Sequence, residues 1–198
     1  MLPAMSAPSA VAATAPLPGE PTLPRGGRAL VVRLSALGDV LFALETVAAL
    51  ADERPDVQID FLVEDRFAGL LRGHAQLDRV LVYPRRNKLS IPKALHTLRQ
   101  RRYDVVLDLH GIQKSAVHVL LARARTKLGA AAPAAREGAA FAYHRRVPMP
   151  EPLPHRAEIG HRLLQAIGLS GVPKAPRLDV PAPPPGLVDD LPRPRVLL

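Results

Sequence analysis

Residues 29–39 read ALVVRLSALGD, a short apolar run followed at once by a polar loop that contains Gly38 and ends on Asp39. Consecutive apolar residues with β-branched valines are typical of a strand buried on both faces, as in a parallel sheet. Beyond the loop, apolar residues recur at helical spacing from Leu41 to Ala51. A buried strand, a tight loop and a helix in this order predict the first unit of an α/β fold.

The same alternation continues along the chain. Further strands are predicted over 57–63, 79–83, 105–109 and 127–130, and further helices over 65–72, 91–102, 114–124 and 155–168. Ser90 is placed to cap one helix at its N-terminus, and Gly168 to end the last one. Strands that alternate with helices imply parallel pairing with right-handed crossovers, so the fold class is α/β with a Rossmann-like parallel sheet.

The two ends of the chain differ from its middle. Residues 1–27 are rich in Ala and Pro without any period, which predicts a disordered tail. Residues 171–195 are Pro-rich again and predict an extended linker, and 195–198 resemble the start of another buried strand. We therefore expect one folded domain over 28–170, with 171–198 as a linker and the beginning of a second domain that the chain lacks.

The chain is strongly basic, with a net charge of +9, and only five of its cations are Lys. Such a charge fits nucleic acid, anionic lipid or phosphorylated substrates, and equally the codon bias of a GC-rich genome. No zinc finger, RNP stretch or basic zipper is present, so we expect no nucleic-acid partner. The absence of Cys excludes disulfides, Cys-bound zinc and thiol catalysis. No apolar run is long enough to span a membrane, and we expect a cytoplasmic monomer.

Ligands of open parallel sheets bind beyond the C-terminal ends of the strands, which points to the loops 33–39, 84–89 and 110–114. Asp39 near a helix N-terminus is ordinarily a helix cap. An ionised carboxylate there can also take the proton of an attacking hydroxyl. Gly38 would let the backbone turn closely into the helix.

The other two loops carry cations. In DLHGIQKS at 108–115, Lys114 and the first amides of the helix could hold an anion, and His110 could carry a proton or contact a substrate. The segment PRRNK at 84–88 could receive an acidic acceptor, although a solvated loop is the default. No His and carboxylate spacing suits a metal, and the dinucleotide, Walker A and nucleophile-elbow motifs are absent.

Three segments together resemble one family. VRLSALGDV at 32–40 is similar to the opening motif of the ADP-heptose:lipopolysaccharide heptosyltransferases, glycosyltransferase family 9. DLHGIQKS at 108–115 is similar to the second motif, and ARE at 135–137 with YHRR at 143–146 resembles the heptosyltransferase I branch. The likeness covers about 28–170. It implies the N-terminal, acceptor-binding half of a GT-B glycosyltransferase, in which two Rossmann-like domains face each other across a cleft.

The resemblance implies transfer of heptose from ADP-heptose to the acidic inner core of lipopolysaccharide, with inversion and without a metal or other cofactor. It places the catalytic base at Asp39. The residues that it implies for substrate binding are Arg33, Ser35, Gly38, His110, Gly111, Lys114, Ser115, Arg136 and His155. The family often has an Arg four residues after that last His, where this chain has Ile159.

The resemblance also implies that the donor nucleotide is held by a C-terminal domain beyond this sequence. We therefore expect little or no transfer by the 198-residue chain, and peripheral contact at most with the cytoplasmic face of the inner membrane. A non-catalytic domain that binds an acidic glycan or glycolipid is the alternative. The two functions differ at Asp39, because binding would survive its replacement by Asn and transfer would not.

Overall fold

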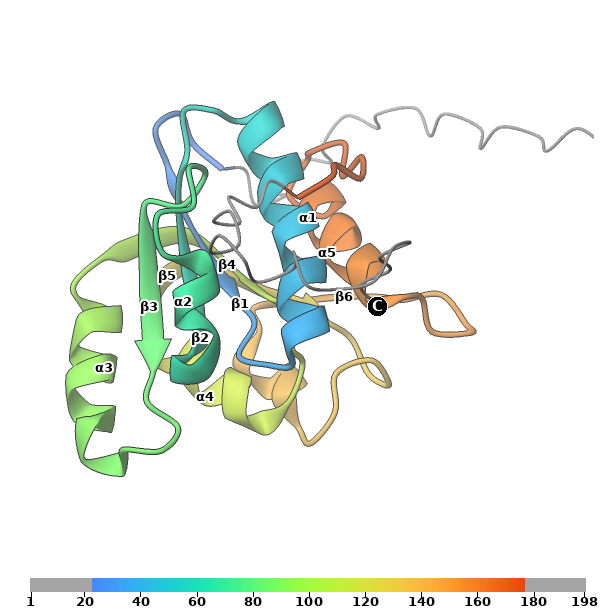
Figure 1. Cartoon of the computed structure of the whole chain (residues 1–198). Coiled ribbons are helices and arrows are strands. Elements are labelled where there is room, and N and C mark those ends of the chain that lie inside the picture. The colour runs from blue at the N-terminus through green and yellow to red at the C-terminus, as the bar shows by residue number, and fades with distance from the viewer. Residues whose placement is uncertain (1–22, 177–198) are drawn as a thin grey trace, which may run out of the picture.

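The structure is a computed structural model, and it describes residues 23–176 of the chain. Most of the predicted tail (1–22) and of the predicted linker (177–198) lies outside the described residues. The described part forms a six-stranded parallel sheet in the order β3-β2-β1-β4-β5-β6 (Figure 1). The strands are β1 (Arg28–Val32), β2 (Gln58–Glu64), β3 (Arg79–Tyr83), β4 (Arg102–Asp108), β5 (Arg123–Ala130) and β6 (Arg145–Val147). The predicted α/β fold with a parallel sheet is confirmed.

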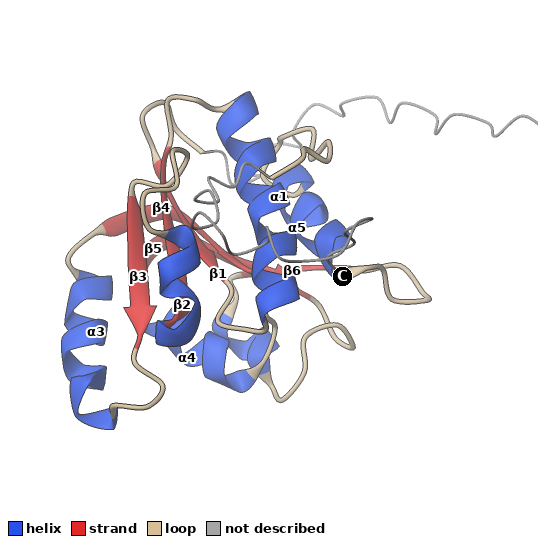
Figure 2. Ribbon diagram, in the orientation of Figure 1, coloured by secondary structure: helices blue, strands red, loops and turns tan. Residues whose placement is uncertain are grey.

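Helices cover both faces of this sheet (Figure 2). The helices are α1 (Leu37–Glu53), α2 (Ala68–Leu71), α3 (Ile91–Arg99), α4 (Gln113–Leu121) and α5 (Arg156–Gln165), with short 3-10 helices η1 (Asp65–Phe67), η2 (Lys88–Ser90) and η3 (Ala139–Ala142). One core cluster lies under α1, α2 and α5, and a second lies under α3, α4 and η3. In β1, Ala29 and Val31 belong to the first cluster and Leu30 and Val32 to the second, because successive side chains of a strand point to opposite faces.

Helices α1 and α5 pack side by side, and their contact has no room for a side chain at Gly160 (Figure 1). A Cβ atom at Gly160 would lie 1.8 Å from the Thr46 hydroxyl and 3.0 Å from the Thr46 Cβ. Glycine at this position therefore lets α5 approach α1 closely. The contact places the start of α5 next to the start of α1, which matters for the site described below.

Several helix and strand boundaries in the structure differ from the predicted ones. Helix α3 ends at Arg99 and α4 at Leu121, earlier than predicted, because strands begin at Arg102 and Arg123. The short strand β6 was missed, since its arginines read as part of a basic cluster. The Ser90 side chain makes no capping hydrogen bond. Gly168 has φ +83°, the left-handed conformation expected of a residue that ends a helix.

The predicted tail also ends earlier than expected, because residues 23–27 belong to the folded domain. Leu23 is buried in the first core cluster. The Arg54 guanidinium donates to the carbonyl oxygens of Leu23 at 2.7 Å and Pro24 at 2.8 Å. The composition of this segment could not reveal these contacts, since they depend on a residue far along the chain. Within residues 23–176, no helix has the length and apolarity needed to cross a bilayer.

Candidate functional site

Three buried polar residues lie in a row where the central strands end. Glu64 is the last residue of β2, Arg33 follows β1 directly, and Asp108 is the last residue of β4. These strands are neighbours in the sheet, and Val32 of β1 lies opposite Leu62 on one side and Asp108 on the other. Charged side chains are rarely buried without partners. This row therefore marks the C-terminal edge of the sheet as the place to look for a site, which agrees with the rule for open parallel sheets.

Asp39 lies in the first turn of α1, and one of its two carboxylate oxygens is held by the protein. The Arg33 guanidinium forms an ion pair with Oδ2, and the Ala36 N–H donates to the same atom at 3.4 Å. Within the described part of the chain, Oδ1 has no protein partner. The side chain is 28% exposed, so the free oxygen can meet a ligand. Asp39 thus accepts from the backbone N–H of Ala36, the N-cap residue of α1, and also presents an accessible carboxylate.

Arg33 faces Asp39 and not the solvent. Its guanidinium also donates to the Leu109 carbonyl at 2.5 Å, so it ties the loop after β1 to the loop after β4. Burial lowers the pKa of Arg33, and the charge of Asp39 and the hydrogen bond to it oppose this shift. The expected direct contact of Arg33 with a substrate stays a prediction. What the geometry shows is a cation that orients the carboxylate of Asp39.

Gly38 and Ser35 flank this pair. Gly38 is exposed and helical, and its φ is not positive, so the predicted reason for glycine here, a tight backbone turn, is wrong. A Cβ atom at Gly38 would meet nothing within 4 Å. The glycine instead leaves open space one residue away from Asp39. Ser35 is partly exposed in the same loop.

Asp108 is fully buried and organises the loop that follows β4. Its carboxylate accepts hydrogen bonds from the backbone N–H groups of His110 and Gly111 and from the hydroxyls of Ser115 and Tyr143, at 2.8–3.2 Å. Burial raises the pKa of Asp108, and these hydrogen bonds oppose the shift. Gly111 has φ +67°, a conformation that favours glycine. The Ser115 hydroxyl is buried in this network, so it shapes the loop and does not reach the open edge.

His110 is uncharged at neutral pH. Burial, and then the positive charges of Arg33 and Lys114, lower the pKa of its ring to about 3. Its Nδ1 atom is buried and has no hydrogen-bond partner within residues 23–176. The predicted proton transfer by His110 would therefore need a large change in its surroundings. A neutral ring that makes a polar contact is the role that the geometry favours.

The predicted anion site of Lys114 and the first amides of α4 stays a prediction, but the chain itself already occupies two of the amides at this helix start. The Gln113 N–H donates to the Glu137 carboxylate at 3.2 Å, and the Ile112 N–H donates to the Ser115 hydroxyl at 3.3 Å. The Lys114 ammonium instead donates to Glu64 at 2.9 Å. Arg66 and Arg85 reach the same carboxylate. The basic loop after β3 thus joins the site, through Arg85.

The remaining predicted residues lie on loops that meet the same edge. Arg136 is exposed in the loop after β5, and its backbone N–H donates to the Gly111 carbonyl at 2.8 Å. His155 is the N-cap of α5, where its Nδ1 accepts from the Ala157 N–H at 3.4 Å. Its ring stacks edge-on against Phe42 of α1, with 4.5 Å between ring centroids. His155 is therefore partly occupied as a cap, although it is exposed.

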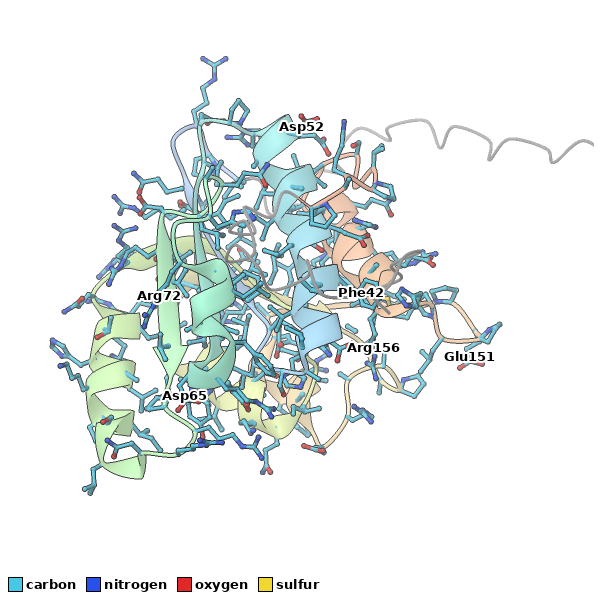
Figure 3. All side chains as sticks on the ribbon, viewed as in Figure 1. Phe42, Asp52, Asp65, Arg72, Glu151 and Arg156 are labelled. Atoms are coloured by element: carbon cyan, nitrogen blue, oxygen red, sulfur yellow. The ribbon has the colours of Figure 1, made fainter. Side chains whose placement is uncertain are left out.

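Two residues that the sequence analysis missed complete this edge. Glu64 ends an apolar run, a position where a buried carboxylate is unexpected and therefore informative. Arg156 is exposed at the start of α5, and Figure 3 shows it and Phe42 on the neighbouring helices α5 and α1. Burial is the main cause of the lowered pKa of Arg33 and of His110, and the charge of Arg156 contributes to both. Arg156 thus adds a cation near Arg33 and His110. No cluster of potential metal ligands occurs among residues 23–176.

Comparison with known proteins gives consistent matches. Residues 91–184 match the model of glycosyltransferase family 9 (heptosyltransferase). The chain is 33% identical over 129 residues to lipopolysaccharide heptosyltransferase 1 of Salmonella typhimurium, which covers 60% of this chain and 41% of that protein. It is 32% identical over 89 residues to the protein of the same name from Campylobacter coli, covering 44% of this chain and 26% of the relative.

Solved structures agree with these sequence matches. Escherichia coli heptosyltransferase WaaC with ADP superimposes with a TM-score of 0.63 at 30% identity, covering 76% of this chain and 48% of that chain. WaaC with ADP-2-deoxy-2-fluoro heptose gives a TM-score of 0.65 at 27% identity, covering 76% and 50%. E. coli heptosyltransferase II, at 19% identity, shares the fold with a TM-score of 0.54, and the match covers 77% of this chain and 46% of that chain. This chain spans about half the length of these solved structures.

Proposed function

Because residues 91–184 match glycosyltransferase family 9 and the chain is similar to lipopolysaccharide heptosyltransferase 1, we propose that its described domain binds the acceptor in an inverting transfer of heptose from ADP-heptose to the lipopolysaccharide inner core. The observation that carries this proposal is the carboxylate of Asp39. One of its oxygens is fixed by Arg33 and Ala36, and the other is free at the ligand-binding edge of the sheet.

In the proposed reaction, the acceptor hydroxyl gives its proton to Oδ1 of Asp39 as its oxygen attacks the anomeric carbon of the heptose. The bond between that carbon and the diphosphate oxygen breaks on the opposite face, and ADP leaves with the bonding electrons. A single displacement inverts the anomeric centre and needs one carboxylate as general base. Arg33 holds Oδ2 throughout, so the carboxylate keeps its direction while Oδ1 becomes protonated.

The charges around Asp39 support an acidic acceptor. Arg85, Lys114 and Arg156 are cations at the same edge, and they are at least partly accessible. Preorganised cations stabilise bound carboxylates and phosphates without further rearrangement. The acceptor is a glycolipid, so this edge would work against the cytoplasmic face of the inner membrane. The residues that hold the nucleotide of the donor are expected outside residues 23–176.

The proposal is tested by titrating deacylated lipopolysaccharide inner-core oligosaccharide into the 198-residue chain, with a neutral oligosaccharide of similar size as control. We expect wild-type and Asp39→Asn chains to bind the acidic oligosaccharide about equally and the neutral one more weakly. Any transfer from ADP-heptose should fall by about 10²–10⁴-fold in Asp39→Asn. A folded wild-type chain that shows no preference for the acidic oligosaccharide would overturn the proposal.

One observation favours the alternative of glycan binding without catalysis. The cations at the edge would bind an acidic sugar whether or not a base is present. The two functions separate in the transfer assay. If transfer proceeds equally in wild type and Asp39→Asn, then Asp39 is not the base. If neither protein transfers heptose but both bind the oligosaccharide, then binding is the function of the 198-residue chain by itself.

A further inference from the structure

Glu64 is a buried carboxylate to which neither the sequence motifs nor the proposed reaction assigns a role. Its side chain is 0% exposed at the end of β2. Lys114 donates to Oε1 at 2.9 Å, Arg66 donates to Oε2 at 2.9 Å, and Arg85 lies 3.6 Å from Oε2. These cations come from α4, η1 and the loop after β3. Three separate segments of the chain therefore meet at one carboxylate.

The cations use only part of their hydrogen-bonding capacity on Glu64. The side chains of Arg66, Arg85 and Lys114 are 43%, 51% and 36% exposed. Arg carries five N–H donors and Lys three, so most of their donors remain available to a ligand. The Arg66 guanidinium also lies over the Phe67 ring, and the Lys114 ammonium lies 5.8 Å from the centroid of Tyr83, which restricts both side chains further.

The charges in this cluster do not balance. Three positive charges share the single negative charge of Glu64. Asp65, the next residue along the chain, is partly exposed, and its carboxylate accepts a hydrogen bond from the backbone N–H of Arg66. Surplus cations held close together repel one another, and an anion bound among them would relieve this repulsion.

We propose that Glu64 is a positioning residue that gathers Lys114, Arg66 and Arg85 into one site for an anionic group of the acceptor, a carboxylate or a phosphate. This inference rests on the proposed function. Glu64 itself touches no substrate. Long exposed cations hold a fixed position poorly by themselves, because ordering them costs side-chain entropy. The buried carboxylate orders all three before the ligand arrives.

The proposal predicts the sign of a charge effect. Replacing Glu64 with Gln removes a negative charge from the site, so simple electrostatics predicts tighter binding of an anion. Loss of positioning predicts weaker binding. A purely structural role predicts a less stable protein whose folded fraction binds as well as wild type. These three outcomes are distinct in one experiment.

The experiment measures the affinities of inorganic pyrophosphate and of deacylated inner-core oligosaccharide for the 198-residue chain by calorimetry. We expect Glu64→Gln to weaken the binding of both ligands by about 10-fold, which corresponds to the loss of roughly one charge-assisted contact. Glu64→Asp keeps the charge but is one methylene shorter, and should lie between. The control is Asp60→Asn, on the same strand, whose carboxylate is also buried beside an arginine. It should bind both ligands as wild type does. Equal or tighter binding by Glu64→Gln would overturn the proposal.

A second set of variants keeps the test decisive if Glu64→Gln fails to fold. Arg66→Gln and Arg85→Gln change exposed side chains, and each should weaken the binding of both ligands by about 5-fold or more. The matched control is Arg72→Gln, which removes the same charge from an exposed side chain. Figure 3 labels Arg72 and Asp65 at opposite ends of α2. If Arg66→Gln and Arg85→Gln bind like Arg72→Gln, the anion site does not exist.

The two ligands separate this inference from the proposed function. If pyrophosphate binding follows the prediction but the inner-core oligosaccharide does not bind, the cation cluster is an anion site and the proposed acceptor is wrong. If the oligosaccharide binds wild type and Glu64→Gln equally, the proposed function survives and the role of Glu64 is refuted.

Discussion

Strand β2 carries two buried carboxylates, and the two ends of the strand use them differently. At one end, Asp60 accepts from Arg101 at 3.2 Å and from the Tyr103 hydroxyl at 2.8 Å, and Arg101 also pairs with Asp78. Two carboxylates thus share one cation and one hydroxyl. At the other end, three cations share Glu64. The charge of Arg79 also acts on Asp60, so the first network sets two cations against two carboxylates, whereas the second keeps an excess of positive charge.

This difference in charge distinguishes a network that stabilises the fold, around Asp60, from a candidate ligand site, around Glu64. Burial raises the pKa of Asp60, and the hydrogen bond from Tyr103 opposes this shift. Burial also raises the pKa of Tyr103, so its hydroxyl stays protonated and keeps donating to Asp60. The surroundings of both residues therefore favour the hydrogen bond that the Tyr103 hydroxyl donates to Asp60. Around Glu64, by contrast, three cations share one carboxylate, and a bound anion would add counter-charge.

The largest expected effect is on stability at the Asp60 end. Asp60→Ala leaves the buried Tyr103 hydroxyl without its acceptor and opens a small cavity, so it should reduce the free energy of unfolding by about 3 kcal/mol. Glu64→Gln should cost only about 1 kcal/mol, because its cations can turn to water. Urea unfolding of both variants measures the two values. Similar losses would mean that both carboxylates are structural, and the comparison would fail.

The dependence of stability on pH gives a second test of this comparison at His110, which lies among the cations of the ligand-binding edge. Its pKa of about 3 in the folded chain is below the 6.5 of an unperturbed histidine. As pH falls through 6.5, the unfolded state gains a proton and the folded state does not, so stability is lost between about 6.5 and 3. His110→Gln should remove about 1–2 kcal/mol of the loss between pH 7 and 5.

Urea unfolding of wild type and His110→Gln at both pH values makes this measurement. The difference between the two proteins isolates the histidine from other titrating groups. A loss of the same size in both proteins would show that the ring is not held neutral by its surroundings.

The smallest expected effect compares two exposed glycines in helices. A Cβ atom at Gly38 or at Gly69 would meet nothing within 4 Å, and neither residue has a positive φ. Substitution by Ala should therefore raise the free energy of unfolding by at most about 0.5–1 kcal/mol in each case. Gly38 lies next to Asp39 and Gly69 lies in α2. Only Gly38→Ala should weaken binding of the inner-core oligosaccharide, as measured by calorimetry. Equal affinities would place the acceptor away from Gly38.

Much of the fold could be predicted from the sequence because its signals are local. The apolar runs and the periods of the helices depend on neighbouring residues, so the first five strands and the order of elements were predictable. Strand β6 was not, because its three residues are rich in arginine and it is a strand only through its pairing with β5. Residues 23–27 were assigned to the tail for the same kind of reason, since their partner is Arg54.

The candidate site likewise has a part that could be predicted from the sequence and a part that could not. Asp39 and the 108–115 loop stand out as motifs, and the structure brings them to one edge. The partners of these residues could not be predicted. Nothing in the sequence around Lys114 indicates Glu64, which lies 50 residues away, and nothing around Gln113 indicates Glu137. Long-range pairs of this kind decide whether a predicted ligand-binding group is free or already occupied by the protein.

The contact between Gly160 and Thr46 has a consequence for protein engineering. It brings together the helix that presents Asp39 and the helix that begins with His155 and Arg156, because any side chain at Gly160 would collide with Thr46. Any attempt to graft this edge onto another Rossmann-like scaffold must therefore transplant α1 and α5 as a single module. A scaffold that spaces its helices by a larger residue would carry every residue of the site and still hold Asp39 at the wrong distance from Arg156.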